Sequence, residues 1–495
     1  MGITFHFPLL LILFPMMAAV AMPLMKNTDI ARNITLAVQI VLIIMAVWLT
    51  FTMFATGTMY FRYQLGYYPA PWGNELRIGM LEAILACAFT AVMMFSLLGT
   101  KKDTEKDIPE GKRSLYYCMI NLLSASLLAL VFTNDLFNAY VFIEISTIAA
   151  CAIVVSKENG DTLKATIKYL FLSVMGSGLF LMSIAILYSI TGHLLMEHIA
   201  QSIAYLAATG DYNFPLTVSL LLFIVSMAVK SALFPFHSWL PDAHGSATTA
   251  SSAILSGLVV KGYVVLLLKL LFRVYGIDTI NALDGLPVLF FLGVTGMIAG
   301  SVMACFQTKL KRLIAYSSVA QIGYIFMGMG LNTHAGFTAA GFHIIAHSFT
   351  KSMLFISAGA LIATSGSYLI ADLTGAGRKN KIAGAAFLVG ALSMAGIPLF
   401  SGFVSKFHLA GAAMQGEHSM WITTVMLSVS TFLNSVYYFP VIVKLYSPAS
   451  GTLKKPAPQF ALTFTLASLM LANVALGIYF TAILNALDSG FRWLG

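Results

Sequence analysis

The chain has 495 residues, of which 59% are hydrophobic and only 9% are charged, and its mean hydropathy is +0.87. A soluble domain carries about 25% charged residues, so this composition excludes a soluble globular protein and indicates one that crosses a membrane many times. Basic residues outnumber acidic ones, 28 against 19. They gather in short loops between apolar segments, which is typical of membrane topology and does not indicate nucleic-acid binding.

Apolar runs of about 20 residues, the length that crosses a bilayer, predict an all-α polytopic membrane fold of fourteen transmembrane segments. In chain order these are 6–25, 33–56, 76–98, 113–132, 135–155, 165–190, 214–234, 245–272, 284–304, 311–331, 337–364, 382–411, 420–446 and 458–484. They leave no room for a separate soluble domain. The first is predicted to be a span and not a signal peptide, because the preceding MGITFHF has no Lys or Arg.

The positions of the 28 Lys and Arg predict the orientation. The odd-numbered loops between spans hold nineteen of them, whereas the even-numbered loops and the C-terminal tail hold only Arg62, Arg77, Arg273 and Arg492. By the positive-inside rule the odd loops face the cytoplasm, which places both chain termini on the outer side of the inner (plasma) membrane. The other five are lysines within spans: Lys230, Lys261, Lys269, Lys351 and Lys406.

Segment 5, NDLFNAYVFIEISTIAACAIV, carries Glu144 about midway along its length. An ionisable group near the bilayer centre costs at least roughly 2.5–3.5 kcal/mol on insertion scales, so it is a functional candidate by default. We predict that Glu144 is half of a switchable ion pair; the alternative is a structural carboxylate neutralised by a neighbouring helix. Asp135, at the outer end of the segment, is predicted to cap the helix.

The stretch AVKSALFPFHSWLPDAH, residues 228–244, places Lys230 at the end of segment 7, followed by Pro235 and Pro241. Proline kinks or ends a helix, and non-helical backbone at membrane depth is tolerated only where it faces protein or a wet cavity. The pattern predicts a buried hydrated site around Lys230, with snorkelling of the lysine to the surface as the alternative.

Three polar residues follow this break: His237, Asp242 and His244. They are candidates for the cytoplasmic entrance of a proton path. The alternative is that they cap the chain as it turns back.

Segment 8 contains two lysines. Lys261 is flanked by Gly257 and Gly262, which allow close helix approach, and its central depth favours a functional role. Lys269 lies about two turns further out, where a lysine snorkels readily.

Segment 11 contains FHIIAHSFTK, which puts His343, His347 and Lys351 on one helix face. Two histidines at this spacing can hold zinc, but no third ligand or HExxH glutamate accompanies them, so we predict no metal site. A polar stripe that carries protons is favoured, because histidine titrates near neutral pH. The alternative is a pair of satisfied core histidines beside a structural lysine.

Segment 12, ALSMAGIPLFSGFVSKFHLAG, carries Lys406 after an interruption at Gly396-Ile397-Pro398. Segments 7 and 12 are thus both broken and lysine-bearing, and since they lie five apart they run in opposite directions. Such pairs are typical of inverted-repeat transporters. The predicted organisation is an N-terminal three-helix addition, a first five-helix repeat, a second inverted repeat and a C-terminal helix, spanning residues 1–112, 113–273, 274–446 and 447–495.

The cysteines Cys87, Cys118, Cys151 and Cys305 lie in or beside apolar runs without CxxC spacing. They are interpreted as small core hydrophobes, and no iron–sulfur cluster, zinc site or disulfide framework is predicted. We therefore expect no cofactor and no catalytic residue in this chain, and any redox centre to lie in a partner.

The predicted mechanism is a relay. A lysine beside a carboxylate stays protonated, whereas one without this partner in a low-dielectric site releases its proton more readily. The predicted buried axis of such groups consists of Glu144, Lys230, Lys261, His343, His347, Lys351 and Lys406. Moving one charge along this axis therefore changes the proton affinity of the next group.

The fourteen spans, the glutamate in segment 5, the lysines in segments 7, 8 and 12, and the run KSALFPFHSWLPDAH resemble one family. It comprises the antiporter-like proton-translocating subunits of respiratory complex I, membrane-bound hydrogenases and Mrp cation/proton antiporters. TNDLFNAYVFIE, YYPAPWG (residues 67–73) and the short end after segment 14 are most similar to the D-type subunits of Mrp antiporters. Glu82 in GMLEAIL departs from the aspartate expected there.

The resemblance implies that Glu144 and Lys230 form the proton-transfer pair, that Lys261 connects them to the next half, and that Lys406 is the terminal lysine. It implies a membrane subunit of a multisubunit Mrp-type cation (Na⁺)/proton antiporter or an Mrp-related hydrogenase, with other membrane subunits as partners. The alternative is a proton-pumping subunit of a quinone-reducing complex I-like NADH dehydrogenase. A mere scaffold is disfavoured, because burying five lysines is a destabilising way to specify packing.

Overall fold

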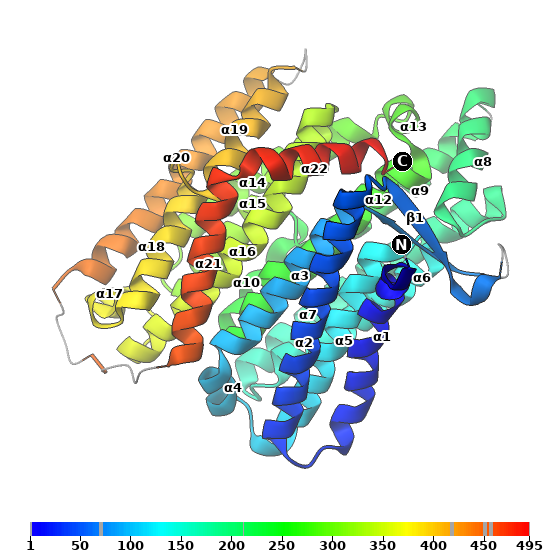
Figure 1. Ribbon diagram of the computed structural model, residues 1–495. Coiled ribbons are helices and arrows are strands. Elements are labelled where there is room, and N and C mark those ends of the chain that lie inside the picture. The colour runs from blue at the N-terminus through cyan, green and yellow to red at the C-terminus, as the bar shows by residue number, and fades with distance from the viewer. Residues whose placement is uncertain are drawn as a thin grey trace.

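The computed structural model describes residues 2–68, 73–210, 212–415, 420–448, 453–454 and 459–494. Residues 69–72 of the YYPAPWG motif and the loop residue Lys455 lie outside these ranges. Within them, 13 helices are long and apolar enough to cross a membrane. The chain is a multi-pass, all-α membrane protein, as predicted (Figure 1).

Twelve of the spans each contain one α-helix, which in the first span, Thr4–Leu24, is flanked by 3-10 turns. These α-helices are α1 (Phe7–Ala21), α2 (Thr28–Thr56), α3 (Met80–Gly99), α5 (Glu110–Phe132), α6 (Leu136–Val155), α7 (Gly160–Thr191), α9 (Asn213–Lys230), α14 (Gly285–Cys305), α15 (Leu310–Gly330), α16 (His334–Ser365), α20 (Met420–Tyr446) and α21 (Phe460–Ile478). The thirteenth, Thr249–Tyr275, is continuous but alternates between α-helix and π-helix. Its parts are α11 (Thr249–Ile254), η5 (Leu255–Val259), α12 (Val260–Leu270) and η6 (Leu271–Tyr275).

Segment 12 is broken, as its Gly-Ile-Pro interruption predicts. It consists of α18 (Lys381–Ala395) and α19 (Ser401–Ala413), neither of which is long enough to span alone. With this pair the chain accounts for the fourteen predicted segments. The two broken segments, 7 and 12, are each the fourth of five consecutive spans, and the inverted-repeat relation and the domain limits remain predictions.

Short elements join the spans. They are η1 (Gly2–His6), η2 (Met22–Leu24), β1 (Tyr60–Gln64), η3 (Leu65–Tyr67), β2 (Glu75–Gly79), α4 (Lys101–Asp107), α8 (Met196–Thr209), η4 (Phe236–Ser238), α10 (Trp239–Ser246), α13 (Ile277–Ala282), η7 (Ile370–Leu373), α17 (Ala376–Lys379) and α22 (Phe480–Arg492).

The N-terminal end of segment 3 is a strand and not a helix, which corrects the prediction that the span begins at residue 76. β2 pairs antiparallel with β1, with Arg62 opposite Arg77. The helix begins only at Met80, because the Glu82 carboxylate accepts a hydrogen bond of 2.8 Å from the backbone N–H of Gly79 and so caps the first turn.

The C-terminal end predicted for segment 14 is also wrong. The span ends at Ile478, not at residue 484, and the chain then turns into α22. This amphipathic helix lies across the end of the bundle, crosswise to α21 (Figure 1). It buries Leu484, Leu487 and Phe491 against the protein, and a period of 3.6 brings such residues onto one face.

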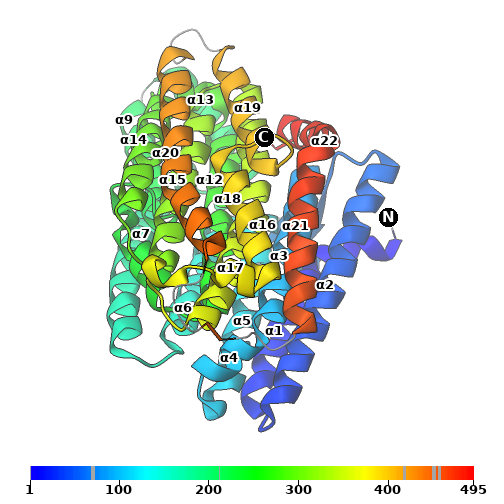
Figure 2. The ribbon, with the colours of Figure 1, turned by 90° about the vertical axis from the view of Figure 1, so that its left-hand side faces the viewer.

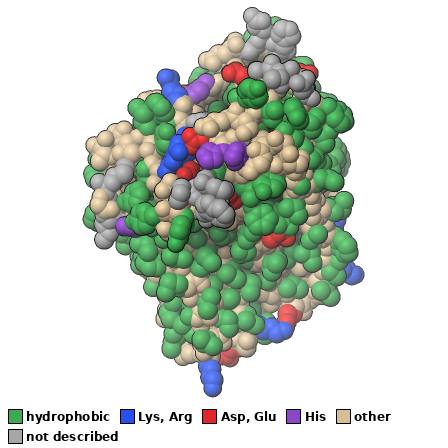
Figure 3. Space-filling model, turned by 90° about the vertical axis from the view of Figure 1, so that its right-hand side faces the viewer, with side chains coloured by type: hydrophobic (Ala, Val, Ile, Leu, Met, Phe, Trp, Pro, Cys, Tyr) green, Lys and Arg blue, Asp and Glu red, His purple; other side chains and the backbone are tan. Residues whose placement is uncertain are grey.

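The most buried spans are Thr249–Tyr275, α16 and α15, which lie inside a shell of peripheral helices (Figures 1 and 2). In the peripheral helices α2, α20 and α21 only 33%, 33% and 22% of the most apolar 18-residue window is buried. In Figure 3 one lateral face is largely hydrophobic, and most charged side chains gather toward its two ends. An apolar belt of this kind fits the hydrocarbon core of a bilayer.

Candidate functional site: a buried polar axis

Glu144 and Lys230 come together from two spans at the first helix break. Glu144 projects from the middle of α6, and Lys230 is the last residue of α9. Lys230 Nζ lies 4.0 Å from Oε1 of Glu144 and donates a hydrogen bond of 2.7 Å to Oγ1 of Thr147, one turn along α6. The lysine side chain is 0% exposed, whereas the glutamate side chain is 29% exposed. The lysine therefore does not snorkel.

The lysine is held by close packing around its stem and head. Gly176 of α7 faces the stem, and a Cβ at that position would lie 3.3 Å from Cγ of Lys230. Lys230 Nζ lies 5.7 Å from the centroid of the Tyr263 ring. The Tyr263 hydroxyl in turn lies 3.0 Å from Oγ of Ser146. A cation over an aromatic face is stabilised by the ring quadrupole, so Tyr263 extends the polar contacts from α9 into α12.

The backbone leaves the helical conformation directly after Lys230. Ala232 has a positive φ of 57°, and Leu399 in the other break has a φ of 84°. Such angles cost residues other than glycine about 1–3 kcal/mol and cluster at functional sites. Trp239 stabilises the turn by donating from Nε1 to the Val229 carbonyl at 3.2 Å and by stacking on Tyr169. Both lysine-bearing breaks thus contain one strained residue.

Lys261 is the second residue of α12, just beyond the π-helical turn η5, and its side chain is fully buried. Its Nζ donates to the backbone carbonyl of Ser256 inside that turn. The Ser256 hydroxyl lies 2.9 Å from Oγ of Ser318 on α15. π-Helical turns are frequent at functional sites; here one supplies a partner for a buried lysine. The flanking glycines allow close packing, as predicted: Gly257 faces Ser352 and Gly262 faces Leu127.

The polar stripe of α16 is buried in the second half of the bundle. The rings of His343 and His347 stack with centroids 5.6 Å apart, and Nδ1 of His343 lies 2.8 Å from Oγ of Ser405. Lys351 Nζ donates to Oγ of Ser317 at 2.8 Å and to the Ile314 carbonyl at 3.0 Å. Ser317 is adjacent to Ser318 in the chain, and Ser318 contacts Ser256, the partner of Lys261. Helix α15 therefore links the surroundings of Lys351 to those of Lys261.

Lys406 closes the axis at the second break. Its Nζ donates to the Met394 carbonyl at 2.6 Å, near the C-terminal end of α18, where helix carbonyls lack intrahelical partners. It lies 5.2 Å from the centroid of the Tyr324 ring, which also stacks on His343. Tyr324 therefore joins Lys406 to the histidine stripe. Within the described ranges no carboxylate pairs with this lysine.

The three candidates for a proton entrance are not gathered in one cluster. Asp242 lies on the predicted cytoplasmic side and forms ion pairs with Lys168 at 2.8 Å and Arg312 at 2.7 Å. His244 is fully buried and stacks on Phe355. His237 is 8% exposed and stacks on Phe234. The three share one segment of chain but face different neighbours.

The prediction that Lys269 snorkels to the surface is wrong. Lys269 is 0% exposed and donates to the carbonyls of Leu130, Val131 and Thr133, where α5 ends. A cation at a helix C-terminus satisfies free carbonyls and complements the helix dipole. Its contacts are those of a structural cap.

The prediction that Arg273 lies in an outer loop is wrong. Arg273 sits in η6, and Nη2 binds Oε1 of Glu82 at 2.6 Å, with both side chains 2% exposed or less. Its Nε donates to the Leu494 carbonyl at 2.9 Å. This buried ion pair ties α3, η6 and the C-terminal residues together. Asp135 caps α6, as predicted, by accepting from the Asn138 N–H at 2.8 Å.

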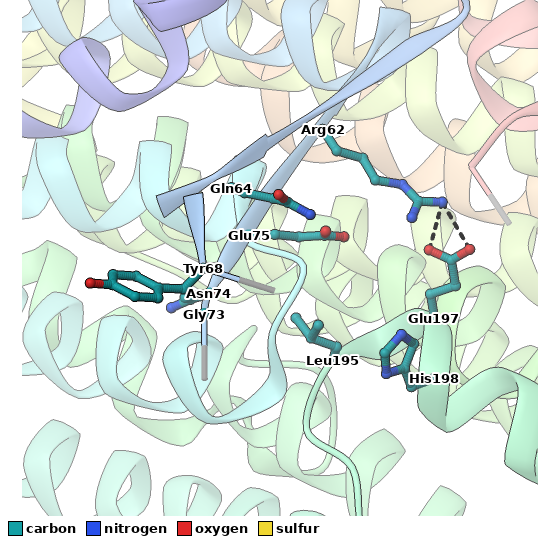
Figure 4. A pocket seen from close by; sticks show the side chains of 9 residues that line it. All are labelled: Arg62, Gln64, Tyr68, Gly73, Asn74, Glu75, Leu195, Glu197 and His198. Atoms are coloured by element: carbon teal, nitrogen blue, oxygen red, sulfur yellow. Dashed lines mark hydrogen bonds and ion pairs between the residues drawn. The ribbon is translucent and has the colours of Figure 1, made fainter. Parts of the chain in front are cut away.

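A polar pocket of about 260 Å³ opens beside the β1–β2 hairpin (Figure 4). Arg62 on β1 reaches across to Glu197 on α8 and contacts both carboxylate oxygens, at 2.8 and 2.6 Å. Glu75 lines the same pocket and accepts a hydrogen bond of 2.7 Å from Asn134. These contacts connect the hairpin to α8 and to the residues just before the N-terminal end of α6.

Several buried polar atoms along the axis have no hydrogen-bond partner among the described residues. They include Oε1 of Glu144, Nε2 of His343, both ring nitrogens of His347 and His244, and the side-chain amide of Gln321. Buried polar groups in proteins are normally satisfied by protein or by ordered water. Among the described residues, no group of three or more His, Cys, Asp or Glu is arranged to hold a metal ion.

Comparison with known proteins adds a family match. Residues 133–434 match the family described as NADH:quinone oxidoreductase/Mrp antiporter, TM. The chain is 31% identical, over 96% of its length and 95% of the relative, to the N-type subunit of NADH-quinone oxidoreductase from Desulforudis audaxviator. It is also 31% identical, over 74% of its length and 72% of the relative, to the D-type subunit of the Na⁺/H⁺ antiporter from Alkalihalophilus pseudofirmus.

Solved structures share the fold over nearly the whole chain. A chain of the membrane-bound sulfane sulfur reductase, an archaeal respiratory membrane complex, superposes with a TM-score of 0.89 at 27% identity, covering 98% of this chain and 97% of the other. A chain of the Mrp complex from a Dietzia species has a TM-score of 0.88 at 20% identity, covering 99% and 97%.

Proposed function

The chain belongs to the NADH:quinone oxidoreductase/Mrp antiporter transmembrane family, and we propose that it is the subunit that moves protons along the buried axis of a multisubunit cation/proton antiporter of the Mrp type. The relatives that are D-type subunits of Na⁺/H⁺ antiporters support this assignment. The transported cation in the proposal is Na⁺, exchanged for H⁺. The proposed orientation places the basic odd-numbered loops in the cytoplasm and both termini on the outer side of the plasma membrane.

The observation that carries the proposal is the fully buried Lys230, 4.0 Å from Glu144 and at a helix end. Two unit charges at that distance interact by about 4 kcal/mol at an effective dielectric of about 20. Gain or loss of a proton by Glu144 therefore changes how tightly Lys230 holds its own proton. Of the two groups, Glu144 is the one whose side chain is partly exposed, by 29%, whereas Lys230 is sealed from its surroundings.

From Lys230 the proposed route runs through buried residues that touch one another or lie within four positions of each other on one helix. It passes Tyr263 to Lys261, then Ser256 and Ser318 to Lys351, and then His347, His343 and Tyr324 to Lys406. The unpartnered nitrogens of His347 and Nε2 of His343 are the places where water would complete the chain of hydrogen bonds. His237, Asp242 and His244 are the proposed cytoplasmic entrance.

Each step moves a proton and a charge together. When Lys230 passes its proton toward Lys261, Glu144 loses its partner and takes up a proton from the proposed entrance. The arrival of charge at Lys351 and His347 then disfavours the charged form of the next group, so that Lys406 releases a proton. The route therefore takes up one proton for each one it releases.

The test uses the complete complex, reconstituted into proteoliposomes with a pH-sensitive dye inside. We expect a Na⁺ gradient to drive proton movement in the wild type and not in Lys230→Met, which keeps the volume of the side chain but not its charge. A wild-type rate in assembled Lys230→Met complex would refute the proposed route.

A second candidate function has its own support. The match to an N-type oxidoreductase relative over 96% of this chain, and the 27% identity to a chain of a respiratory reductase complex, favour a redox-driven proton pump. The buried axis would be used in the same way, with the driving force coming from another subunit. Copurification decides: flavin or iron–sulfur subunits indicate the redox complex, and only small membrane subunits indicate the antiporter.

A further inference from the structure

A second pocket, of about 360 Å³, opens at the predicted cytoplasmic end of the bundle. It lies between the N-terminal turns of α7 and α15, with α10 contributing Gly245 and Ser246. Four basic side chains line it: Lys164, Lys168, Lys309 and Arg312. Two acidic side chains, Asp161 and Asp242, line it as well, so the basic charges exceed the acidic ones by two.

The basic side chains differ in how far they are already engaged. Asp242 holds Lys168 and Arg312 at 2.8 and 2.7 Å. Lys164 and Lys309 are exposed and form no ion pair with another residue in the described ranges. Two cations therefore remain for an anion from outside the chain.

Two features of the backbone favour an anion at this place. The helices α7 and α15 both begin here, and the positive end of a helix dipole attracts negative charge. Gly245 leaves room for the arginine: a Cβ there would lie 3.0 Å from Cγ of Arg312. The Arg312 side chain can therefore pack closely on α10, with the guanidinium at the pocket.

The pocket continues into a lipid-facing apolar surface. Lys164 and Lys168 share a face of α7 with Phe171 and Met175, which follow at helical spacing toward the middle of the span and are 70% and 63% exposed. Phe306, which follows α14 and precedes Lys309 by three residues, is 78% exposed. A ligand with an anionic head and long apolar tails matches a basic pocket that adjoins an apolar surface.

We propose that this pocket binds the phosphate diester of an anionic phospholipid, with the phosphate between Lys164 and Lys309 and the acyl chains along Phe171 and Met175. A free phosphate has the same head chemistry but cannot use the apolar face. Basic pockets between transmembrane helices on the cytoplasmic side are a known means of holding lipid head groups. The proposal does not depend on which ion the subunit moves.

The test uses the complete complex, purified in detergent and delipidated, with native mass spectrometry to count bound molecules. It is titrated in separate arms with phosphatidylglycerol, with phosphatidylcholine and with inorganic phosphate. We expect Lys164→Gln/Lys309→Gln to bind phosphatidylglycerol at least about tenfold more weakly than the wild type, on the order of the loss of one charge-assisted contact. Phosphatidylcholine should bind weakly to both.

The matched control is Lys101→Gln/Lys102→Gln, which removes two exposed cytoplasmic charges outside the pocket. It should bind phosphatidylglycerol like the wild type. Equal binding by the pocket variant, an equal loss in the control, or equal binding of phosphatidylcholine would each overturn the proposal. Variant-sensitive binding of inorganic phosphate without phosphatidylglycerol would overturn the assignment to a lipid. Because Lys164 and Lys309 are exposed, size-exclusion chromatography should show an intact complex.

Discussion

Lys230 Nζ is 2.7 Å from Oγ1 of Thr147 but 4.0 Å from Oε1 of Glu144. The lysine thus has a direct neutral partner one turn along α6 from the carboxylate, and the charge pair itself is close without a direct hydrogen bond. A pair in this geometry can exchange partners by a small side-chain movement. This relationship makes Glu144 and Lys230 the first residues to change.

We predict that Glu144→Ala and Lys230→Ala each reduce proton transport to the level of vesicles that lack the protein, because each removes one half of the coupled pair. Both complexes should still assemble. Transport is measured by dye quenching in vesicles, and assembly by copurification of the other subunits. Wild-type transport in the double variant would eliminate the relay.

Lys269→Met should lower stability while leaving the transport rate per assembled complex close to that of the wild type. The change leaves the carbonyls that end α5 without their cation, and an unsatisfied buried polar group costs about 1–3 kcal/mol. Thermal unfolding in detergent measures the first effect, and transport normalised to assembled protein measures the second. If the specific rate fell as far as in Lys230→Ala, Lys269 would belong to the axis.

Glu82→Ala should destabilise the protein by about 3–5 kcal/mol, because it leaves the guanidinium of Arg273 buried and uncompensated. The double change Glu82→Met/Arg273→Met should recover much of that loss, since it removes both charges. Asp488→Ala is the control: it breaks the contacts with Arg492 and His334, whose side chains are 69% and 42% exposed, and each such exposed pair contributes about 0–1 kcal/mol. Equal melting temperatures for Glu82→Ala and the control would contradict the prediction.

Gly402→Ala should disrupt the second break, whereas Gly411→Ala on the same helix should be tolerated. A Cβ at Gly402 would overlap the Ser393 carbonyl, while one at Gly411 meets nothing within 4 Å. Since the close contact is with backbone, relief requires α18 and α19 to separate, which moves Lys406 away from the Met394 carbonyl. We expect loss of transport and a lower melting temperature only for the first variant. Similar behaviour of both would show that the contact yields easily.

Apolar runs predict most spans to within a few residues, and segment 13 coincides with α20 at residues 420–446. The failures have local causes. The start of α3 depends on the cap formed by Glu82, a short signal that an average over 20 residues hides. The end predicted for segment 14 lies too far along the chain because the apolar residues of α22 follow those of α21, and only their periodicity distinguishes an interfacial helix from a span.

The charged members of the axis can be named from the sequence because a charge inside an apolar run is rare. Their hydroxyl partners, such as Thr147, Ser318 and Tyr324, cannot, since Ser, Thr and Tyr are common in membrane helices and nothing in the chain states which helices adjoin. The sequence pattern places Arg273 in a loop for a similar reason. Its partner Glu82 lies 191 positions away in the chain, and no local pattern reports that contact.

The crosswise helix α22 also limits how this protein can move. Gly490 at its far end packs on the backbone of Leu81 in α3, and Phe491 packs on Gly341 of α16. Phe491 also lies against Phe272 of η6, with ring centroids 5.7 Å apart, so α22 braces a helix of the first predicted repeat against one of the second. A rocking cycle, in which the two halves rotate apart, would have to tear this brace from one of its anchors. Passing charge by small side-chain movements leaves the frame of helices intact, so mechanical stiffness and proton transfer are compatible in this architecture.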